Sequence, residues 1–373
     1  MNPYERLGVK QYINAAATLT AFGGSIMPPE VLEAMGEASK SYVSIVDLQF
    51  KAGAYLASLT GNEAAMVSNG AAAGMVLATA ACIAGDDAEK RGKLPYTDGM
   101  ANEILVCACS RVGYDFALRQ AGGKIVEYGD KNGATAQQLE EAITDKTAAI
   151  FIFYFEHKMD KQVPVEVQVS IAGRHGIPVI VDAAAQLPLR ENLHRFTRDW
   201  GVDAAIFSGG KGLCGPQSSG LVVGKKELVH RMISFGCPNN GIGRPMKVGK
   251  EEIMGLVKAV ELYMQRDMEQ EQLSFERQVQ MVIDAFSEDS SVQVTQDFPS
   301  EAGQPMPRAK LTLVPGVFRV DAQDINEQLK QGNPGVLCAA DSDSLLINPQ
   351  TLQLGDIEIV IARLKQTLSQ NLK

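Results

Sequence analysis

The sequence of 373 residues is 45% hydrophobic and 21% charged, which is ordinary for a soluble globular protein of two or three domains at about 100–200 residues each. Its formal net charge of -9 provides no field that would attract nucleic acid or an anionic membrane, so neither is expected as a partner. Residues 1–11 are polar and no apolar run approaches the roughly 20 residues of a membrane span, so we expect a cytoplasmic protein without a signal peptide.

The cysteines and histidines show no pattern that is typical of a metal site. None of the six cysteines belongs to a Cys-x-x-Cys pair, and the four histidines have no ligand spacing relative to them. Cys107 and Cys109 alternate along an apolar run, which favours two small core residues over metal or redox chemistry. We therefore predict that the protein binds no metal.

From about residue 60 onward, short apolar runs alternate with longer amphipathic stretches. The amphipathic stretches include 135–143 and 165–176, which fit helices. The apolar runs are 103–109, 124–129, 147–155, 177–183, 203–209 and 219–225. Continuous apolar strands alternating with helices predict an α/β domain with a mostly parallel, doubly wound sheet covered on both faces.

The pattern changes after residue 245. One or two long helices are followed by short strands near 292–297 and 309–315 and by a final helix that begins at Asp356. These elements predict a smaller C-terminal α+β domain. We therefore expect an N-terminal segment that packs on the large domain or a partner subunit, the large domain itself, and a connecting helix with the small domain, at residues 1–45, 46–248 and 249–373.

Ligands of parallel sheets bind outside the carboxyl ends of the strands, so the loops at these ends are the candidate sites. In the first such loop, the tiny residues that follow Ser68 and Asn69 open a long helix. The free N–H groups and positive dipole of a helix start form an anion site, to which Ser68 and Asn69 add side-chain donors. An ordinary N-cap followed by a closely packed helix explains this loop equally well.

The second loop carries Asp182, which closes the apolar run 177–183. An acidic residue at the end of a buried strand is costly unless it meets a partner, and a cationic ring nitrogen would be one. A cap for the following turn is the alternative interpretation.

The third loop is FSGGKGLCGPQSSG, residues 207–220, in which five glycines surround Lys211. Glycine lets another molecule approach the backbone closely. A phosphate loop of the Walker type needs Ser or Thr after the lysine, whereas Gly212 follows here. A lysine that forms a Schiff base with an aldehyde and a solvated turn both remain open for this loop.

Together the three loops supply what pyridoxal phosphate requires. A lysine attaches the aldehyde, an acid keeps the pyridine nitrogen protonated, and a helix start with hydroxyl groups holds the phosphate. Each signal is weak alone, but their occurrence in this order along a doubly wound sheet predicts this cofactor.

The sequence resembles the fold-type I pyridoxal-phosphate enzymes. Within them it is similar to the bacterial selenocysteine synthase (L-seryl-tRNA selenium transferase) group and its smaller relatives, the D-glucosaminate-6-phosphate ammonia-lyases. The resemblance covers nearly the whole chain. It is carried by INAAATLT (13–20), SNGAAAG (68–74), FSGGKGLCGPQSSGLVVGKKEL (207–228), GRPMKVGKEE (243–252) and LLINPQTLQLGD (345–356).

The resemblance implies roles for individual residues of the predicted cofactor-binding domain. Lys211 and Asp182 are the catalytic pair, the lysine binding the cofactor aldehyde and the aspartate facing the ring nitrogen. The remaining cofactor contacts are Ser68, Asn69, Gly70, Ala71 and Ser208 around the phosphate and Ser110 beside the ring. The substrate contacts are Arg111, His157, Arg244 and Lys247, although a basic turn in solvent also explains the last two and a surface position also explains His157.

Two departures from the selenocysteine synthases argue against aminoacyl-tRNA as the substrate. Those enzymes carry an additional N-terminal domain for tRNA, whereas the INAAA segment begins here at residue 13, so we expect no such domain. Their early Asn-Leu-Gly-Arg stretch is replaced by residues 22–25, Phe-Gly-Gly-Ser, which lack the arginine. A small amino acid, anionic or phosphorylated, is the substrate that we expect.

The predicted reaction is therefore an ammonia-lyase reaction on a polyhydroxylated 2-amino acid such as D-glucosaminate 6-phosphate. Racemisation, transamination or another β-elimination on the same scaffold is the nearest alternative, because the cofactor supports all of them. A selenium transferase acting on seryl-tRNA and a catalytically inert homologue are the others. By resemblance we expect a homodimer or a larger even assembly.

Overall fold

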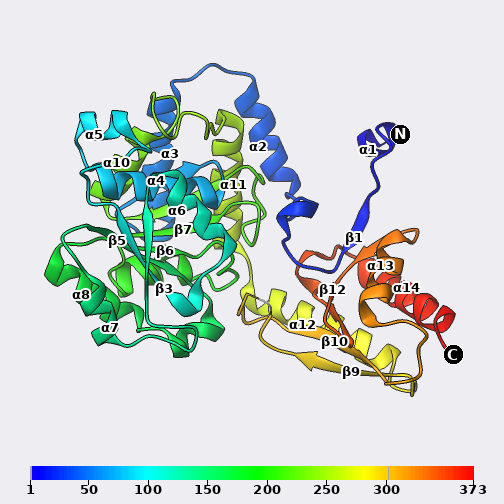
Figure 1. Cartoon of the computed structure of the whole chain (residues 1–373). Coiled ribbons are helices and arrows are strands. Elements are labelled where there is room, and N and C mark those ends of the chain that lie inside the picture. Colours follow the sequence, from blue (N-terminus) through cyan, green and yellow to red (C-terminus); the bar gives the residue numbers. More distant parts are fainter. Residues whose placement is uncertain (1, 301) are drawn as a thin grey trace. The chain divides into compact units, whose positions relative to one another are not determined.

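The computed structural model describes residues 2–300 and 302–373, which form two compact units (Figure 1). The large unit is Ile26–Gln265, and the small unit combines Met1–Ser25 with Arg266–Lys373. These boundaries differ from the predicted 1–45, 46–248 and 249–373. The first 25 residues fall in the small unit because β1 (Tyr12–Asn14) pairs with β11 (Gly335–Leu337). Helices α2 (Pro29–Ser39) and α11 (Lys250–Gln265) pack against each other in the large unit.

A mixed sheet of seven strands forms the centre of the large unit. Its order is β2 (Ala64–Ser68), β8 (Gly220–Gly224), β7 (Ala204–Ser208), β6 (Val179–Asp182), β5 (Thr147–Phe153), β3 (Glu103–Cys107) and β4 (Lys124–Tyr128). All neighbours are parallel except that β8 runs antiparallel to both β2 and β7. The predicted α/β class with a mostly parallel sheet is confirmed, while β2 was not among the predicted strands.

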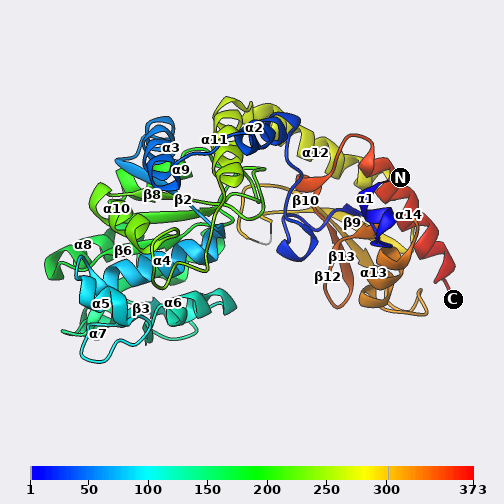
Figure 2. The same cartoon turned by 90° about the horizontal axis from the view of Figure 1, so that it is seen from above.

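Helices cover both faces of this sheet. Helices α4 (Gly70–Ala84), α6 (Phe116–Gln120) and α10 (Lys226–Phe235) share one core with the strands, and Figures 1 and 2 both show α4 beside α10. Helix α4 is almost entirely small or apolar and is buried over most of its length, as expected of a helix without a polar face. The other helices of the unit are α3 (Ile45–Thr60), α5 (Ala88–Lys93), α7 (Ala136–Ala142), α8 (Val165–His175) and α9 (Asn192–His194).

The side chain of Gln49 protects the outer edge of β2. Its Nε2 donates to the carbonyl oxygen of Val67 at 2.6 Å, and its Oε1 accepts from the Val67 N–H at 3.2 Å. Because Gln49 is buried in α3, this amide replaces the neighbouring strand that an edge strand lacks. The clamp fixes β2 one residue before Ser68.

The small unit has the predicted α+β character. Its four-stranded antiparallel sheet has the order β12 (Ala339–Ala340), β13 (Ser344–Ile347), β10 (Arg308–Leu313) and β9 (Val292–Asp297). Apolar residues of this sheet share a core with helices α12 (Met268–Ala285), α13 (Ala322–Gln331) and α14 (Asp356–Gln370), and the short α1 (Pro3–Arg6) precedes β1.

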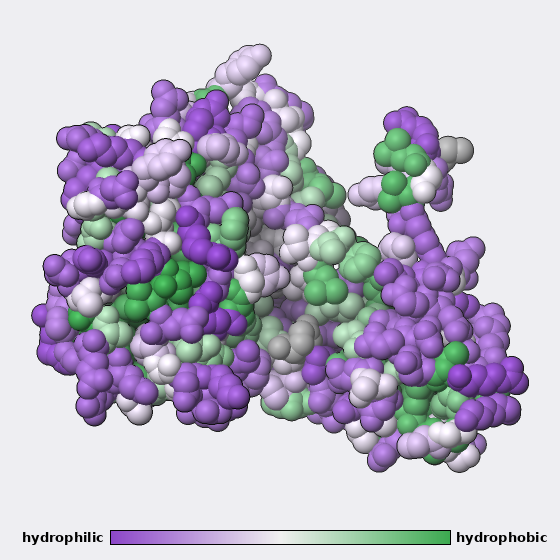
Figure 3. All heavy atoms as spheres, viewed as in Figure 1, coloured by the Kyte–Doolittle hydropathy of each residue, from purple (hydrophilic) through white to green (hydrophobic). Residues whose placement is uncertain are grey.

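Hydrophilic side chains cover most of each unit on the face shown in Figure 3. Within residues 2–300 and 302–373, no helix combines the length and the apolar character that crossing a membrane requires. Buried apolar residues form the core of each unit.

Substitution of Gly53 by alanine is expected to destabilise the protein by about 1–3 kcal/mol, as overpacking of a core does. A Cβ on Gly53 would lie 2.1 Å from the carbonyl oxygen of Ala65, so α3 would have to move away from β2. Gly36→Ala is the matched control, because a Cβ on this exposed position of α2 meets nothing within 4 Å and should add about 0.5–1 kcal/mol. Urea unfolding measures both; an unchanged midpoint for Gly53→Ala would contradict the packing argument.

Candidate active site

Three strands bring the predicted catalytic loops to one edge of the large sheet. Ser68 pairs with Gly220, and Gly220 pairs in turn with Ser208, so the two serines flank β8. Asp182 ends the next strand, β6, where it pairs with Ile206 of β7. Lys211 follows Ser208 by three residues. The carboxyl ends of β2, β7 and β6 therefore form one site from segments that are far apart in the sequence.

The loop between β2 and α4 is built for close packing over β8. Ser68 is buried, and its hydroxyl donates to the carbonyl oxygen of Gly70 at 2.9 Å. Gly70, at φ +80°, begins α4, and the N–H groups of this first turn lack partners within the helix. A Cβ on Gly220 would lie 2.7 Å from the carbonyl carbon of Gly70 and 2.9 Å from the nitrogen of Ala71. Gly220 thus shapes the predicted phosphate loop, a role that we did not predict.

Asn69 connects this loop to the basic turn around residues 244–247. Its Nδ2 donates to the carbonyl oxygen of Lys247 at 2.9 Å. The side chains of Lys247 and Arg244 are exposed, and an Arg244 guanidinium nitrogen lies 3.8 Å from the sulfur of Cys237. The structure therefore ties the backbone of Lys247 to the residue that precedes α4, and Arg244 lies three residues earlier in the same turn.

Asp182 lies deep in the large unit, although part of its surface is accessible. Its Oδ1 accepts a hydrogen bond from the Ala184 N–H at 3.0 Å. Burial raises the pKa of this carboxyl, and the Ala184 hydrogen bond and the positive charge of Lys211 only partly oppose the shift. A second cation facing the carboxylate would offset this desolvation cost, so the site suits a protonated pyridine nitrogen.

The backbone around Lys211 is a tight loop. The Cys214 N–H donates to the carbonyl oxygen of Lys211 at 2.9 Å, and the Gly215 N–H donates to that of Gly209 at 2.8 Å. A Cβ on Gly209 would lie 2.0 Å from Ser219 Oγ, and one on Gly210 would lie 2.6 Å from the Cα of Gln217. We expected another molecule to approach the backbone at these glycines, but Ser219 and Gln217 of the protein itself fill that space. The close packing of Gly209 and Gly210 holds the loop that carries Lys211.

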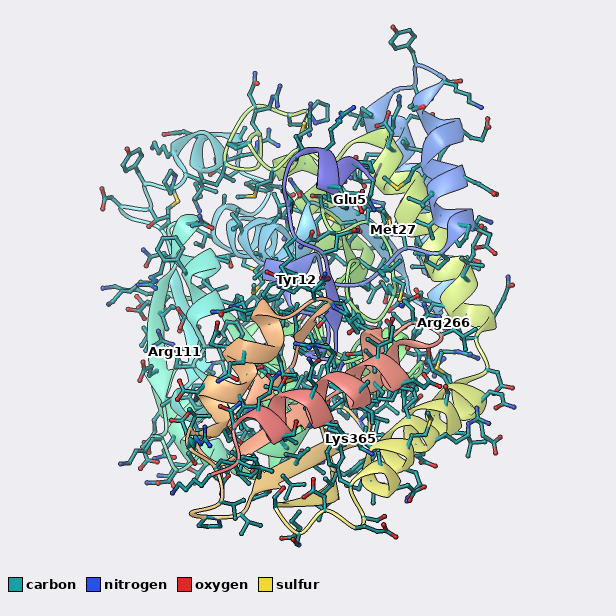
Figure 4. All side chains as sticks on the ribbon, turned by 90° about the vertical axis from the view of Figure 1, so that its right-hand side faces the viewer. Glu5, Tyr12, Met27, Arg111, Arg266 and Lys365 are labelled. Carbon is teal, nitrogen blue, oxygen red and sulfur yellow. The ribbon has the colours of Figure 1, made fainter. Side chains whose placement is uncertain are left out.

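The residues after β3 belong to the same carboxyl edge of the sheet, because β3, β5 and β6 are parallel. In the sheet order β5 separates β3 from β6, so Ser110 and Arg111 are two strands away from Asp182. Ser110 is buried and donates to the carbonyl oxygen of Cys107 at 3.1 Å. The guanidinium of Arg111, labelled in Figure 4, pairs with the carboxylates of Asp115 and Glu127. Two acids that we did not predict therefore hold Arg111. Glu127 lies 16 residues along the chain from Arg111, so no local sequence pattern could have indicated this ion pair.

His157 follows β5, the strand beside β6, and lies in the short helical turn Glu156–Lys161. Its ring is exposed and packs edge-on against Phe155 at 6.1 Å between ring centroids. Partial burial and the neighbouring charge of Lys158 lower the pKa of His157, which favours the neutral imidazole at neutral pH. The position is compatible with the predicted substrate contact.

A cavity of about 590 Å³ lies at the opposite edge of the sheet. Its lining includes Thr147 and Pro178, at the amino ends of β5 and β6, and the charged pair Lys225 and Asp203. Parallel sheets bind ligands at the carboxyl edge, so this cavity is the weaker candidate.

Comparison with known proteins agrees with this geometry. The family model described as L-seryl-tRNA selenium transferase matches residues 12–353. The chain is 32% identical to the D-glucosaminate-6-phosphate ammonia lyase of Salmonella typhimurium, over 98% of this chain and 97% of that protein. It is 33% identical to a 5'-C-glycyluridine monooxygenase-decarboxylase of Streptomyces, over 98% and 92%.

Solved structures show the same relationship. The structure of a D-glucosaminate-6-phosphate ammonia-lyase superposes with a TM-score of 0.88 at 31% identity, covering 100% of this chain and 99% of that one. A serine palmitoyltransferase of S. paucimobilis with bound PLP superposes with a TM-score of 0.58 at 13% identity, covering 96% and 88%, and shows the shared fold. The fold is that of the fold-type I pyridoxal-phosphate enzymes, as predicted.

Proposed function

Because this chain belongs to the L-seryl-tRNA selenium transferase family, we propose that it is a pyridoxal-phosphate-dependent ammonia-lyase. Its substrate is a polyhydroxylated 2-amino acid such as D-glucosaminate 6-phosphate, and its products are a 2-keto-3-deoxy acid and ammonia. The observation that carries the proposal is the buried Asp182 carboxylate within the field of Lys211, at the strand edge where α4 begins. The ammonia-lyase of Salmonella, similar over its full length, supports the choice of reaction.

The residues at the carboxyl edge fit the cofactor. Asp182 would stabilise a positive charge on the ring nitrogen, and the first turn of α4, from Gly70 and Ala71, would bind the phosphate. Ser68 and Ser208 would line the phosphate site, and Ser110 the ring. When bound, pyridoxal phosphate supplies an electron sink for negative charge at the carbon that bears the amino group.

Lys211 would move the protons of the reaction. Its amine takes the proton from the α-carbon as a general base, because the ring nitrogen and Asp182 stabilise the charge left behind. The β-hydroxyl leaves with a proton as water. Addition of one water to the nitrogen-bearing carbon then releases ammonia, so the net products are the keto acid and ammonia.

Arg244 and Lys247 would bind the anionic groups of the substrate. A planar guanidinium suits a carboxylate, and an ammonium acts on a phosphate as a point charge. The Asn69 hydrogen bond, which joins the Lys247 backbone to the start of α4, supports this assignment for Lys247. The residue that binds the phosphate is the one that distinguishes phosphorylated from unphosphorylated substrates.

Lys247→Met is expected to raise KM for D-glucosaminate 6-phosphate roughly 10- to 100-fold, since a charge-assisted hydrogen bond is worth about 1.5–3 kcal/mol. Steady-state kinetics on the phosphorylated and unphosphorylated amino acids measure the effect, which should be smaller for the second. Lys226→Met, at the opposite edge of the sheet, is the matched control. An equal KM in Lys247→Met and the control would refute the contact.

The similarity to a monooxygenase-decarboxylase favours a second candidate, an oxidative decarboxylation. The two reactions separate in one assay of the cofactor-loaded protein with D-glucosaminate 6-phosphate. The lyase releases ammonia and a keto acid without oxygen uptake, whereas the second reaction consumes oxygen and releases carbon dioxide. Oxygen uptake in step with turnover would overturn the lyase proposal.

The proposed enzyme acts in the cytoplasm as a homodimer or a larger even assembly. Apolar side chains are exposed together between α2 and α3 and along α3, at Tyr42, Val43, Val46 and Phe50. Several exposed apolar side chains in one short segment favour association with another subunit. Light scattering coupled to gel filtration measures the assembly, and a monomer would contradict it.

A further inference from the structure

Two cysteine thiols face each other at the end of β3, outside the proposed catalytic machinery. Cys107 is the last residue of the strand and is buried, as predicted for a core residue, whereas Cys109 in the following turn is partly exposed. Their sulfur atoms lie 3.3 Å apart, and neither takes part in a disulfide. The turn Ala108–Ser110 brings together two side chains that are separated by a single residue.

The two sulfurs differ in their surroundings, because Cys107 is buried and Cys109 is partly exposed. Burial and the hydrogen bond to Cys109 raise the pKa of the Cys107 thiol to about 12, so Cys107 keeps its proton. The thiolate is the nucleophile in disulfide exchange, and the more accessible of two thiols meets a small-molecule disulfide first. The partly exposed Cys109 is therefore the attacking residue, and the buried Cys107 is the resolving residue.

We propose that Cys107 and Cys109 form a redox-active dithiol that closes reversibly to an intramolecular disulfide by exchange with a small-molecule disulfide. The Cys109 thiolate attacks one sulfur of oxidised glutathione and releases one glutathione thiolate. Cys107 gives its proton to a thiolate and attacks the Cys109 sulfur, which releases the second glutathione. Two protein thiols are oxidised and one disulfide is reduced to two thiols, so atoms and electrons balance.

The geometry favours closure over a stable mixed disulfide. A disulfide bond measures about 2.0 Å, so two sulfurs that lie 3.3 Å apart need to approach by about 1.3 Å. The resolving thiol is already in contact with the sulfur that it attacks, which makes the second step effectively unimolecular. The Ser110 hydroxyl donates a hydrogen bond to the carbonyl oxygen of Cys107. Formation of the disulfide would therefore affect the turn that contains Ser110 and precedes Arg111.

Peptide mapping of the full chain tests this dithiol without reference to the enzymatic reaction. The tryptic peptide 94–111 contains both cysteines and no other cysteine. The protein is treated with oxidised glutathione, its remaining thiols are alkylated in acidic denaturant, which stops exchange, and it is then digested. We expect this peptide to lose two hydrogen atoms and to resist alkylation, and dithiothreitol to restore both thiols.

Two variants make the outcome decisive. In Cys109→Ser, Cys107 should remain open to alkylation after the same treatment. In Cys338→Ser, a matched change of a buried thiol in the small unit, the disulfide in peptide 94–111 should still form. Recovery of the wild-type peptide with two alkyl groups, or with glutathione retained on Cys109, would overturn the proposal.

Discussion

Replacement of Lys211 by alanine is expected to lower turnover by at least about 10³-fold, because one side chain attaches the cofactor and moves the α-proton. The loop that carries the lysine depends on the packing of Gly209 and Gly210, so the fold should survive the loss of an amine. Ammonia release measures the activity. Borohydride treatment of the wild-type holoenzyme should leave a covalent cofactor adduct on the Lys211 peptide and none in the variant.

Two further variants separate chemistry from charge in this experiment. Lys211→Arg keeps the positive charge near Asp182 but cannot condense with an aldehyde, so it should be as inactive as the alanine variant. Lys226→Ala removes a lysine at the opposite edge of the sheet and should keep wild-type turnover. Substantial activity in Lys211→Arg would show that the covalent role of this lysine is wrong.

Asp182→Asn is expected to lower turnover by roughly 10²–10³-fold, the size usual for one preorganised electrostatic contact. The same substitution should make the cofactor-free protein more stable at neutral pH, because burial of the charged carboxylate opposes folding and an amide carries no charge. Activity and urea unfolding of the cofactor-free protein measure the two effects. If the reaction requires a buried charge that destabilises the fold, the same substitution should lower the turnover and raise the stability.

The stability gain should depend on pH in a defined direction. Burial raises the pKa of Asp182 above its ordinary value of 3.8, so the folded state holds this proton more tightly than the unfolded state does. The wild type therefore loses stability relative to Asp182→Asn as the pH rises from about 3.8 through the raised pKa, and the difference is constant above it. A difference that shrinks with rising pH would contradict the assignment.

Asp203→Asn provides the matched control for this pair of effects. Asp203 lies at the opposite edge of the same strands, where it pairs with Lys225 and accepts from the Val179 N–H at 2.8 Å. Its replacement should destabilise the protein and leave the turnover of the folded enzyme unchanged. Asp182→Glu keeps the charge and should retain more activity than Asp182→Asn.

The amino-acid sequence alone determined the class of the fold and the centre of the site. All seven residues of β5 are buried, and a continuous apolar run such as 147–155 is stable only between two covering layers of helices. Because parallel strands end at one edge, the order of the loops along the chain was enough to place Asp182 and Lys211 together. These features depend on local composition and on a general rule of sheet topology.

Only the tertiary structure decided which residues complete the site and which surround it. The antiparallel β8 lies between β2 and β7, which brings Gly220 against the start of α4. Glu127 of β4 forms an ion pair with Arg111. Strand order and side-chain partners depend on contacts between segments that are distant in the sequence, and no local pattern records them. The same reason applies to Cys107 and Cys109. Their alternation along a strand predicted two separate core residues, whereas the structure brings their sulfur atoms to 3.3 Å from each other.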